Sequence, residues 1–422
     1  MEHRTISKIE VAGWAAATFA ALLASYSAFR PVRDALILDG DPDNLPWVFI
    51  ATFAAISVAS PAWSALLARR PPRAFVAWAF HAAALCAIGF ALLVRAELAP
   101  VLVGRAFYVW SAVFSLFVIS VFWSLLADLL GTATARQLYG PIAAGGTIGG
   151  LVGPLLTRQL VGLIGVAGVL VMSAVLLELA VLGVARIRRL AAHMAAALAA
   201  PVEPDQPPGG GALTGLAQVA RSRYLSAIVG YVLCTACAAT FMYLEQSKLA
   251  HAALADRVAR TSFFATIDTW TAAVTLVLQA LVAGPAIRRF GPGVVLAVLP
   301  IAQLIGISVM SLAPSLTALA ILQVIGKSAT HGLTRPAREL LFTVVSRDEK
   351  YRAKHAIDTI GYRLGDVTSS WLYKGLIALG AGTSVLIGAA VPLVALWLAL
   401  ATSLGAGFHR RASRGATSKE PA

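Results

Sequence analysis

The sequence has little charge and lacks the motifs that mark enzyme and metal sites. Only 13% of its residues are charged, about half the share found in soluble domains, which excludes an ordinary soluble fold. It contains no H-E-x-x-H or G-x-S-x-G motif and no Cys/His cluster with zinc spacing. The three cysteines, Cys86, Cys234 and Cys237, all lie in apolar runs, where cysteine is typically a packing residue. We therefore expect no enzyme activity, no bound metal and no cofactor.

Long apolar runs are abundant instead. The mean hydropathy is +0.79, and apolar segments recur along the whole chain. A membrane-spanning helix needs about 20 such residues. The sequence therefore predicts an all-α integral membrane protein with twelve transmembrane helices. They are expected at residues 11–29, 46–68, 74–94, 101–127, 140–161, 165–185, 224–244, 262–283, 292–313, 315–334, 355–377 and 382–404.

The net charge of +14 by itself is compatible with nucleic-acid binding, but the position of the charges favours another explanation. With the N-terminus inside, 23 of the 34 Lys and Arg residues fall in cytoplasmic segments and 8 in external segments. This asymmetry is the positive-inside rule. The first apolar run, Val11–Phe29, is longer than the core of a cleaved signal peptide. We therefore expect a multi-pass protein of the bacterial inner (cytoplasmic) membrane, with both termini cytoplasmic, contact with anionic lipid and no nucleic-acid partner.

One break in composition divides the chain into two halves. A Pro/Gly-rich stretch at residues 201–211 follows the sixth predicted span and has the composition of a linker. Six spans, a cytoplasmic linker and six more spans is the plan of the major facilitator fold, in which substrate binds near the midplane between the two bundles. The predicted regions are an N-terminal bundle at 1–189, a linker at 190–222, a C-terminal bundle at 223–408 and a basic tail at 409–422.

Ionisable residues gather in the tenth and eleventh predicted spans. Lys327, His331 and Arg335 are four residues apart and would share one face of an α-helix. Arg363 and Asp366 are three apart and can pair on the next span. A cation at the centre of a bilayer costs about 2.5–3.5 kcal/mol, which calls for a carboxylate or an anionic substrate beside it. An internal salt-bridge network is the alternative explanation.

Further polar residues lie in earlier spans. Arg33 and Asp34 end the first span, where they are either interfacial anchors or part of a substrate path. Tyr108 lies on the aromatic fourth span and is either a packing residue or a cavity residue. Asp268 has threonine neighbours on the eighth span, which makes it a stronger functional candidate than the isolated Glu178 of the sixth.

Glycines at fixed spacing open the fifth span. Gly145, Gly149 and Gly153 are four residues apart, a spacing that lets two helices approach closely. The stretch is similar to the fifth-helix antiporter motif of the major facilitator superfamily. Either a sliding interface or static packing explains it.

Four stretches of the chain resemble the ATP/ADP translocase family, the nucleotide-exchanger branch of that superfamily. The resemblance is closest to its free-living bacterial branch, the NTP/NDP exchange transporters. The stretches are Arg30–Asp34, Phe107–Asp128, Arg136–Pro154 and Tyr351–Asp366, together with the motif Arg335-Pro-Ala-Arg338-Glu339. The resemblance implies the major facilitator fold and a transport function.

The residues that the exchangers use for transport correspond only partly to this sequence. The first-span lysine of the family corresponds to Arg33, and the fourth-span glutamate to Tyr108. The seventh-span glutamate falls near Met242, with Glu245 one turn away, and the eleventh-span lysine corresponds to Asp366. The resemblance therefore implies the fold, whereas an ATP/ADP substrate does not follow from it.

We expect a monomeric secondary active transporter that works by alternating access. Its substrate would be an organic anion such as a nucleotide or phosphorylated metabolite, carried by exchange or with protons. The alternatives are a proton-coupled exporter of amphiphilic or cationic molecules and a non-transporting membrane scaffold. The residues expected to bind the substrate are Arg33, Tyr108, Glu245, Lys327, His331 and Arg363. Those expected to couple or gate transport are Asp34, Asp268, Asp358 and Asp366.

Overall fold

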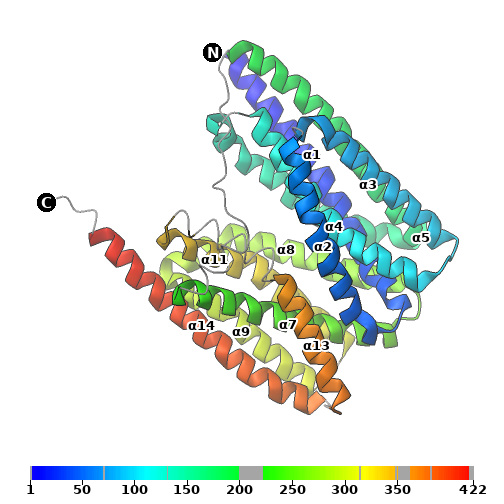
Figure 1. Ribbon diagram of the computed structural model, residues 1–422, viewed down its shortest axis with the longest axis vertical. Coiled ribbons are helices and arrows are strands. Elements are labelled where there is room, and N and C mark those ends of the chain that lie inside the picture. Colours follow the sequence, from blue (N-terminus) through cyan, green and yellow to red (C-terminus); the bar gives the residue numbers. More distant parts are fainter. Residues whose placement is uncertain are drawn as a thin grey trace. The chain divides into compact units, whose positions relative to one another are not determined.

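The computed structural model describes residues 2–69, 72–130, 132–198, 222–312, 315–346, 349, 362–380 and 383–417. Nearly all of them are helical, and none of the residues in these ranges forms a strand (Figure 1). The all-α prediction is therefore confirmed. The chain divides into two compact units, which we describe separately.

The first unit contains Met1–Asn44, Ile50–Asp205 and Leu254–Thr269. Its most extensive contact joins α1 to α5, while α3 packs against both α4 and α5. Stacked and edge-on rings of Phe29, Phe107, Trp110 and Phe114 fill the space between α1 and α4. The elements are α1 (Glu2–Leu36), η1 (Ile37–Asp39), η2 (Pro42–Asn44), α2 (Leu45–Arg69), α3 (Pro72–Arg95), α4 (Pro100–Leu129) and α5 (Thr132–Leu198).

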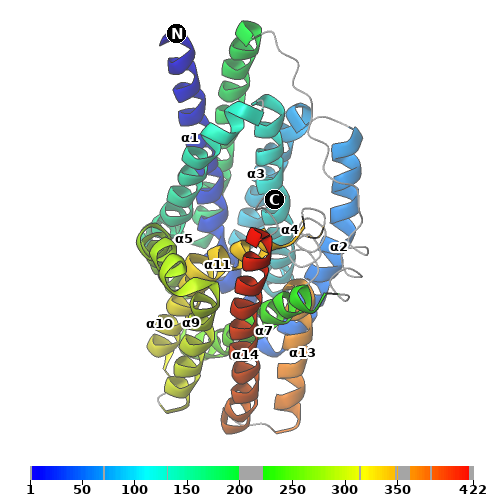
Figure 2. The same ribbon diagram turned by 90° about the vertical axis from the view of Figure 1, so that its left-hand side faces the viewer.

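The second unit contains Leu45–Phe49, Gln206–Ala253 and Trp270–Ala422. Here α14 lies along α9 and α7, α13 packs on α7, and α10 lies beside α9 (Figure 2). The buried Tyr231 hydroxyl donates to the Leu296 carbonyl over 2.8 Å and so joins α7 to α9. The elements are α7 (Arg223–Ala253), α8 (Arg257–Val277), η3 (Leu278–Ala283), α9 (Gly284–Leu312), α10 (Leu316–Ala329), η4 (Thr330–Thr334), α11 (Arg335–Leu341), η5 (Phe342–Val344), α13 (Tyr362–Ala378) and α14 (Thr383–Thr417). The first residues of α8, up to Thr269, belong to the first unit.

Eight helical stretches in the described ranges are long and apolar enough to cross a membrane. Two of them, Gln137–Ala192 and Arg257–Met310, are 56 and 54 residues long. Each contains a glycine with positive φ, Gly165 at 69° and Gly291 at 78°, a conformation that favours glycine. Because these glycines lie where one predicted span ends and the next begins, each long stretch covers two predicted spans. The count of twelve and the predicted domain bounds stay predictions.

The glycines of the fifth span form a close contact between α5 and α1. A Cβ atom added at Gly145, Gly149 or Gly153 would lie well inside contact distance of the carbonyl oxygen of Ala16, Ala20 or Ala24, respectively. The two backbones approach this closely because small residues line both helices. Gly150, one residue away on α5, has nothing within 4 Å of the same added atom. The predicted close approach is therefore confirmed, on one face of α5.

We expect Gly149→Ala to destabilise the protein and Gly150→Ala to leave it at least as stable. The added methyl group at residue 149 meets the Ala20 backbone, which cannot rotate away, and overpacking of this kind costs about 1–3 kcal/mol. Alanine is the better helix former at both positions, so the matched pair isolates the steric effect. Thermal unfolding in detergent, followed by tryptophan fluorescence, measures it. Equal melting temperatures for the two variants would contradict the close contact.

Candidate functional site

Three of the predicted site residues come together in the first unit. Arg33, at the end of α1, donates from Nε to Asp34 Oδ1 over 2.8 Å, and its Nη2 lies 2.7 Å from the same oxygen. The Arg33 guanidinium carbon is 4.9 Å from the ring centroid of Tyr108 on α4. The Arg33 and Asp34 side chains are 17% and 6% exposed. A guanidinium stacked on an aromatic face presents a delocalised charge that suits planar anionic groups.

Asp268 has a partner that the sequence analysis did not predict. Arg30 of α1 holds both carboxylate oxygens of Asp268, from Nε over 2.9 Å and from Nη2 over 2.8 Å. The Asp268 side chain is 3% exposed and that of Arg30 29%. Two parallel contacts of this kind are the strong, directional form of an ion pair. The signal was present in the Arg30-Pro-Val-Arg33 spacing, since residues three apart lie on neighbouring positions of one helix face.

In the second unit, the contact between α7 and α13 carries two predicted carboxylates. The buried Tyr373 hydroxyl of α13 donates to Glu245 Oε1 of α7. Thr240 Oγ1 of α7 donates to Asp366 Oδ1 of α13 over 3.3 Å. Lys248 Nζ lies 5.0 Å from the centroid of the Tyr373 ring. Tyr373, which the sequence analysis missed, thus contacts both an acidic and a basic side chain.

The predicted face of Lys327, His331 and Arg335 is interrupted. Residues Thr330–Thr334 form a π-helical turn, so the regular α-helix assumed for this face does not continue from Lys327 to Arg335. A second π-helical turn, η3, lies against it, and Gln279 Nε2 of η3 donates to the His331 carbonyl over 3.1 Å. His331 is exposed and Lys327 half-buried. Single π turns are frequent at functional sites.

Two predicted residues cannot be placed. Asp358 lies outside the described residues, and of Arg363 only the backbone at the start of α13 is described. No group of three or more His, Cys, Asp or Glu residues suited to a metal ion occurs among the described residues.

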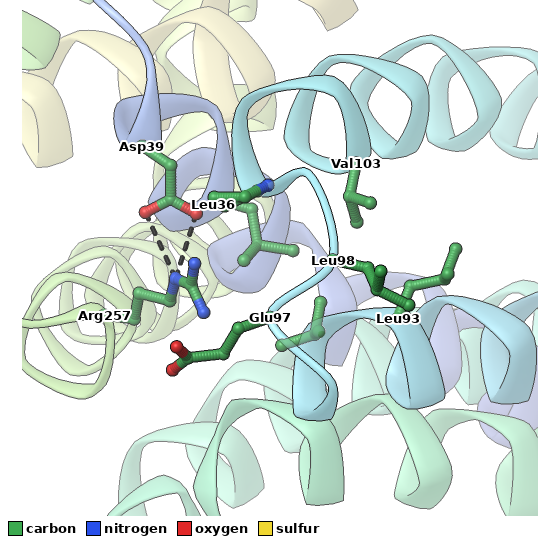
Figure 3. Close-up of a pocket in the computed structure, with 9 residues that line it drawn as sticks. Leu36, Asp39, Leu93, Glu97, Leu98, Val103 and Arg257 are labelled. Carbon is green, nitrogen blue, oxygen red and sulfur yellow. Dashed lines mark hydrogen bonds and ion pairs between the residues drawn. The ribbon is translucent and has the colours of Figure 1, made fainter.

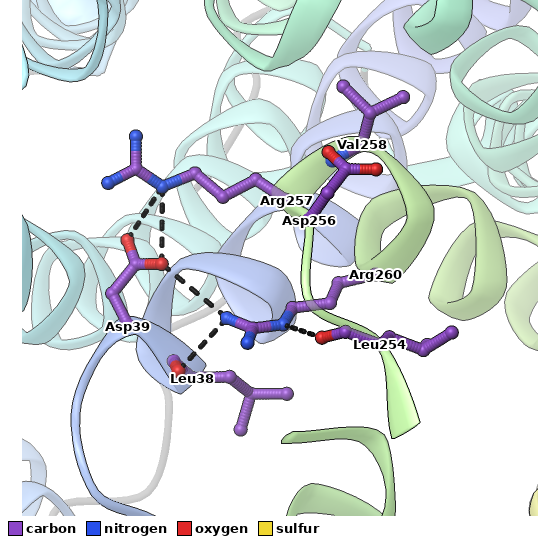
Figure 4. Close-up of polar contacts among 7 residues, drawn as sticks. All are labelled: Leu38, Asp39, Leu254, Asp256, Arg257, Val258 and Arg260. Carbon is purple, nitrogen blue, oxygen red and sulfur yellow. Dashed lines mark hydrogen bonds and ion pairs between the residues drawn. The ribbon is translucent and has the colours of Figure 1, made fainter. Parts of the chain in front are cut away.

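A further charged cluster lies where α1 ends and α8 begins. Asp39 of η1 accepts from Arg257 Nε through both carboxylate oxygens, over 3.1 and 2.9 Å. The Arg257 guanidinium lies between Asp39 and Glu97 in a small pocket that the end of α3 and the start of α4 also line (Figure 3). Arg260 Nη1 is 3.6 Å from Asp39 Oδ1 and donates to the Leu38 carbonyl over 3.0 Å (Figure 4). In the sequence, Arg257 and Arg260 are two of the eight Lys and Arg residues counted in external segments.

We expect Tyr373→Phe to lower the stability of the protein measurably. The change removes the hydroxyl that donates to Glu245, and hydrogen bonds to charged groups contribute about 1.5–3 kcal/mol. Tyr139→Phe is the matched control, because the Tyr139 hydroxyl donates to no residue in the described part of the chain. The melting temperature in detergent is the measurement. If both substitutions shift it by the same amount, the Tyr373 contact contributes nothing.

Comparison with known proteins identifies relatives of part of the chain. Residues 297–408 match the family model described as TLC ATP/ADP transporter. The chain is 25% identical over 172 residues to ADP,ATP carrier protein 1 of Chlamydia trachomatis, covering 35% of this chain and 33% of the carrier. It is 26% identical over 172 residues to the carrier of the same name from Chlamydia pneumoniae, again covering 35% of this chain and 33% of that protein. The chain therefore matches about one third of the length of these relatives.

Solved structures share the fold over almost the whole chain. A bacterial homologue of the iron transporter ferroportin, in an inward-facing state, matches with a TM-score of 0.62 at 13% identity, covering 97% of this chain and 99% of that one. The nucleoside transporter NupG matches with a TM-score of 0.61 at 11% identity, covering 95% and 99%. At sequence identities this low, the structural similarity shows a shared fold and no more. The chain is thus a multi-pass membrane protein whose residues 297–408 are similar to the TLC ATP/ADP transporter family and whose fold is the one seen in these solved transporters.

Proposed function

We propose that the protein is a secondary active transporter that works by alternating access and carries an organic anion, such as a nucleotide or phosphorylated metabolite, by exchange or together with protons. The observation that carries this proposal is the match of residues 297–408 to a family of ATP/ADP transporters. That stretch includes Lys327 and the π-helical turn at His331. The fold shared with solved transporters supports the alternating-access part of the proposal.

Anion binding is the proposed role of the cations in the spans. Arg33 stacks on Tyr108 at 4.9 Å, which gives a charged group and a flat ring on neighbouring helices. A nucleotide presents phosphates and a planar base, and a guanidinium beside an aromatic ring suits both. Lys327, His331 and Arg363 are the further residues proposed to bind the substrate.

Coupling is the proposed role of the acidic residues. Asp34 and Asp268 each pair with an arginine of α1, and Asp366 accepts from Thr240. A carboxylate that pairs with a substrate-binding cation competes with an anionic substrate for that cation, which links binding to protonation or to movement of the carboxylate. Asp34 is proposed to act in this way on Arg33, and Asp268, Asp358 and Asp366 are proposed to couple or gate transport.

The substrate class is left broader than ATP and ADP for a chemical reason. Of the four positions that the exchangers use, only Arg33 keeps the charge of the family. Asp366 stands where the family has a lysine, and Glu245, the proposed substitute for the seventh-span glutamate, accepts a hydrogen bond from Tyr373. Two carboxylates on the α7–α13 contact favour the second candidate function, proton-coupled export of cationic or amphiphilic molecules.

We further propose the inner membrane of a bacterium as its location, with both termini cytoplasmic, and a monomer as its working form. The distribution of Lys and Arg between alternate segments of the sequence supports this orientation.

Counterflow into liposomes with labelled ATP, ADP and phosphate tests the function. We expect saturable uptake by the unmodified protein, and a loss of at least about tenfold in kcat/KM for Arg33→Ala and Lys327→Ala, because each removes a cation proposed to hold the anion. Arg33→Lys should retain more activity than Arg33→Ala because it keeps the charge. Arg95→Ala is the control, since Arg95 is an exposed cation at the end of α3.

The two candidate functions give opposite results in this assay. Anion transport predicts loss in the arginine and lysine variants. If these variants keep full transport of the labelled anions while Asp366→Asn abolishes it, the cations do not hold the substrate and the exporter model gains support. Absence of saturable uptake of all three anions would overturn the nucleotide or phosphate substrate.

A further inference from the structure

Two neighbouring helices of the second unit, α9 and α14, carry basic charge and no acidic charge. Neither helix contains an aspartate or a glutamate. Their basic residues gather at one end of each helix, in segments that the sequence predicts to be cytoplasmic. These residues are Arg288 and Arg289 near the start of α9, and His409, Arg410, Arg411 and Arg414 near the end of α14. The charge is therefore not balanced within either helix.

The packing of α9 against α14 brings the two basic ends together. These helices share the most extensive helix contact of the second unit (Figure 2). A Cβ atom added at Gly293 would lie 2.7 Å from the Cα of Gly405, so the two backbones touch there. A Cβ atom added at Gly291 would lie 3.1 Å from Nε2 of His409. The arginines of α9 come two and three residues before Gly291, and those of α14 follow His409. Both groups of cations therefore lie at the same end of the α9–α14 contact.

The arginines at this end are open to an anion from outside the chain. Arg288, Arg289 and Arg410 are exposed, and none of them forms an ion pair with an acidic side chain of the described residues. The predicted cytoplasmic end of α5 differs, because Arg186 there pairs with Glu10 over 2.9 Å. The α9–α14 end is thus a concentration of positive charge that the protein itself does not neutralise.

An exposed apolar stripe continues from this charged end along α9. Val294, Val298 and Ile301 are 56%, 41% and 47% exposed, and their spacing of four and three residues places them on one face of the helix. Phe290, 56% exposed, directly precedes the stripe in sequence. The guanidinium carbon of Arg289 is 5.5 Å from the centroid of the Phe290 ring. An arginine at a membrane interface lays its stem on apolar surface and keeps its charge among polar groups.

An anionic phospholipid matches both parts of this surface. Its phosphate accepts hydrogen bonds from guanidinium groups, which bind phosphate more specifically than an ammonium group does. Its acyl chains can cover the apolar stripe. A free phosphate or a nucleotide would use the cations alone, and a zwitterionic lipid carries its own cation beside the phosphate. Anionic lipids are abundant in the cytoplasmic leaflet, where basic pockets between membrane helices bind their headgroups.

We propose that the basic end of the α9–α14 contact is a binding site for an anionic phospholipid. Arg288, Arg289 and Arg410 hold the headgroup phosphate, and the stripe from Val294 to Ile301 lies against the acyl chains. The whole site belongs to the second unit. It includes none of the residues proposed to bind the transported substrate, and it does not depend on what the protein transports.

Native mass spectrometry of the purified protein in detergent, titrated with dioleoyl phosphatidylglycerol, tests the site. We expect Arg288→Gln/Arg289→Gln to raise the Kd of this lipid about 25-fold, because each basic residue near an anionic headgroup contributes about fivefold. Arg288→Lys/Arg289→Lys keeps both charges and should retain most of the affinity. An unchanged Kd in the glutamine variant would overturn the proposal.

Arg188→Gln/Arg189→Gln is the matched control. These two arginines are also adjacent and exposed, and they lie at the predicted cytoplasmic end of α5. Their replacement removes the same charge from the protein and should leave the Kd within about twofold. An equal loss of affinity in both double variants would mean that the lipid responds to total charge, and the α9–α14 site would be wrong.

Comparison of ligands on the unmodified protein needs no variant and separates a lipid from a soluble anion. We expect dioleoyl phosphatidylglycerol to bind at least about tenfold more tightly than dioleoyl phosphatidylcholine, because only the first has a net negative charge. We also expect it to bind at least about tenfold more tightly than dihexanoyl phosphatidylglycerol, whose short chains cover less of the stripe. Equal affinity for the two headgroups would overturn the proposal. Equal affinity for the two chain lengths, or displacement of the lipid by millimolar inorganic phosphate, would show a site for a soluble anion instead.

Discussion

Much of the structure depends on the cost of placing charge among apolar helices. In the first unit Arg33 and Arg30 each hold a carboxylate, and in the second unit Glu245 and Asp366 accept hydrogen bonds from a tyrosine and a threonine. An ionised group without a partner in such surroundings would cost several kcal/mol. The contacts that join two helices therefore help to fix which helix faces meet, and the two arginines have the chemistry to bind an anion.

Helix packing in the molecule is close in one place and adaptable in another. On α5, glycines let the α1 backbone approach until no side chain fits between them. Between α8 and α10, two π-helical turns lie together and are joined through Gln279 and the His331 carbonyl. A π turn leaves part of the regular backbone hydrogen bonding displaced. The α1–α5 contact is suited to two helices that move together as a rigid body. The η3–η4 contact is suited to a place where helices change their packing.

The candidate site illustrates how far local sequence reasoning extends. Arg33 and Asp34 were predicted from their position at the end of the first span, and Tyr108 from its place on the aromatic fourth span. The three do lie together. Four residues were not predicted as site residues, because each contacts a partner that lies far away in the sequence. They are Arg30, Tyr373, Arg257 and Arg260. The α-helix expected through Lys327, His331 and Arg335 is interrupted for another reason. Helical spacing was projected through residues that form a π turn, and no composition rule marks such a turn.

By itself the sequence determined the class of protein. Long apolar runs with little charge have no stable alternative to membrane-embedded helices, since a backbone in lipid must satisfy its own hydrogen bonds. The glycine spacing on α5 predicted a close helix contact. Only the tertiary structure decided which charges pair. Arg30 and Asp268 are 238 residues apart, and Arg257 and Asp39 are 218 apart. Hydropathy and periodicity are local properties, whereas a pairing over such separations is set by the packing of whole helices, which no short stretch of sequence encodes.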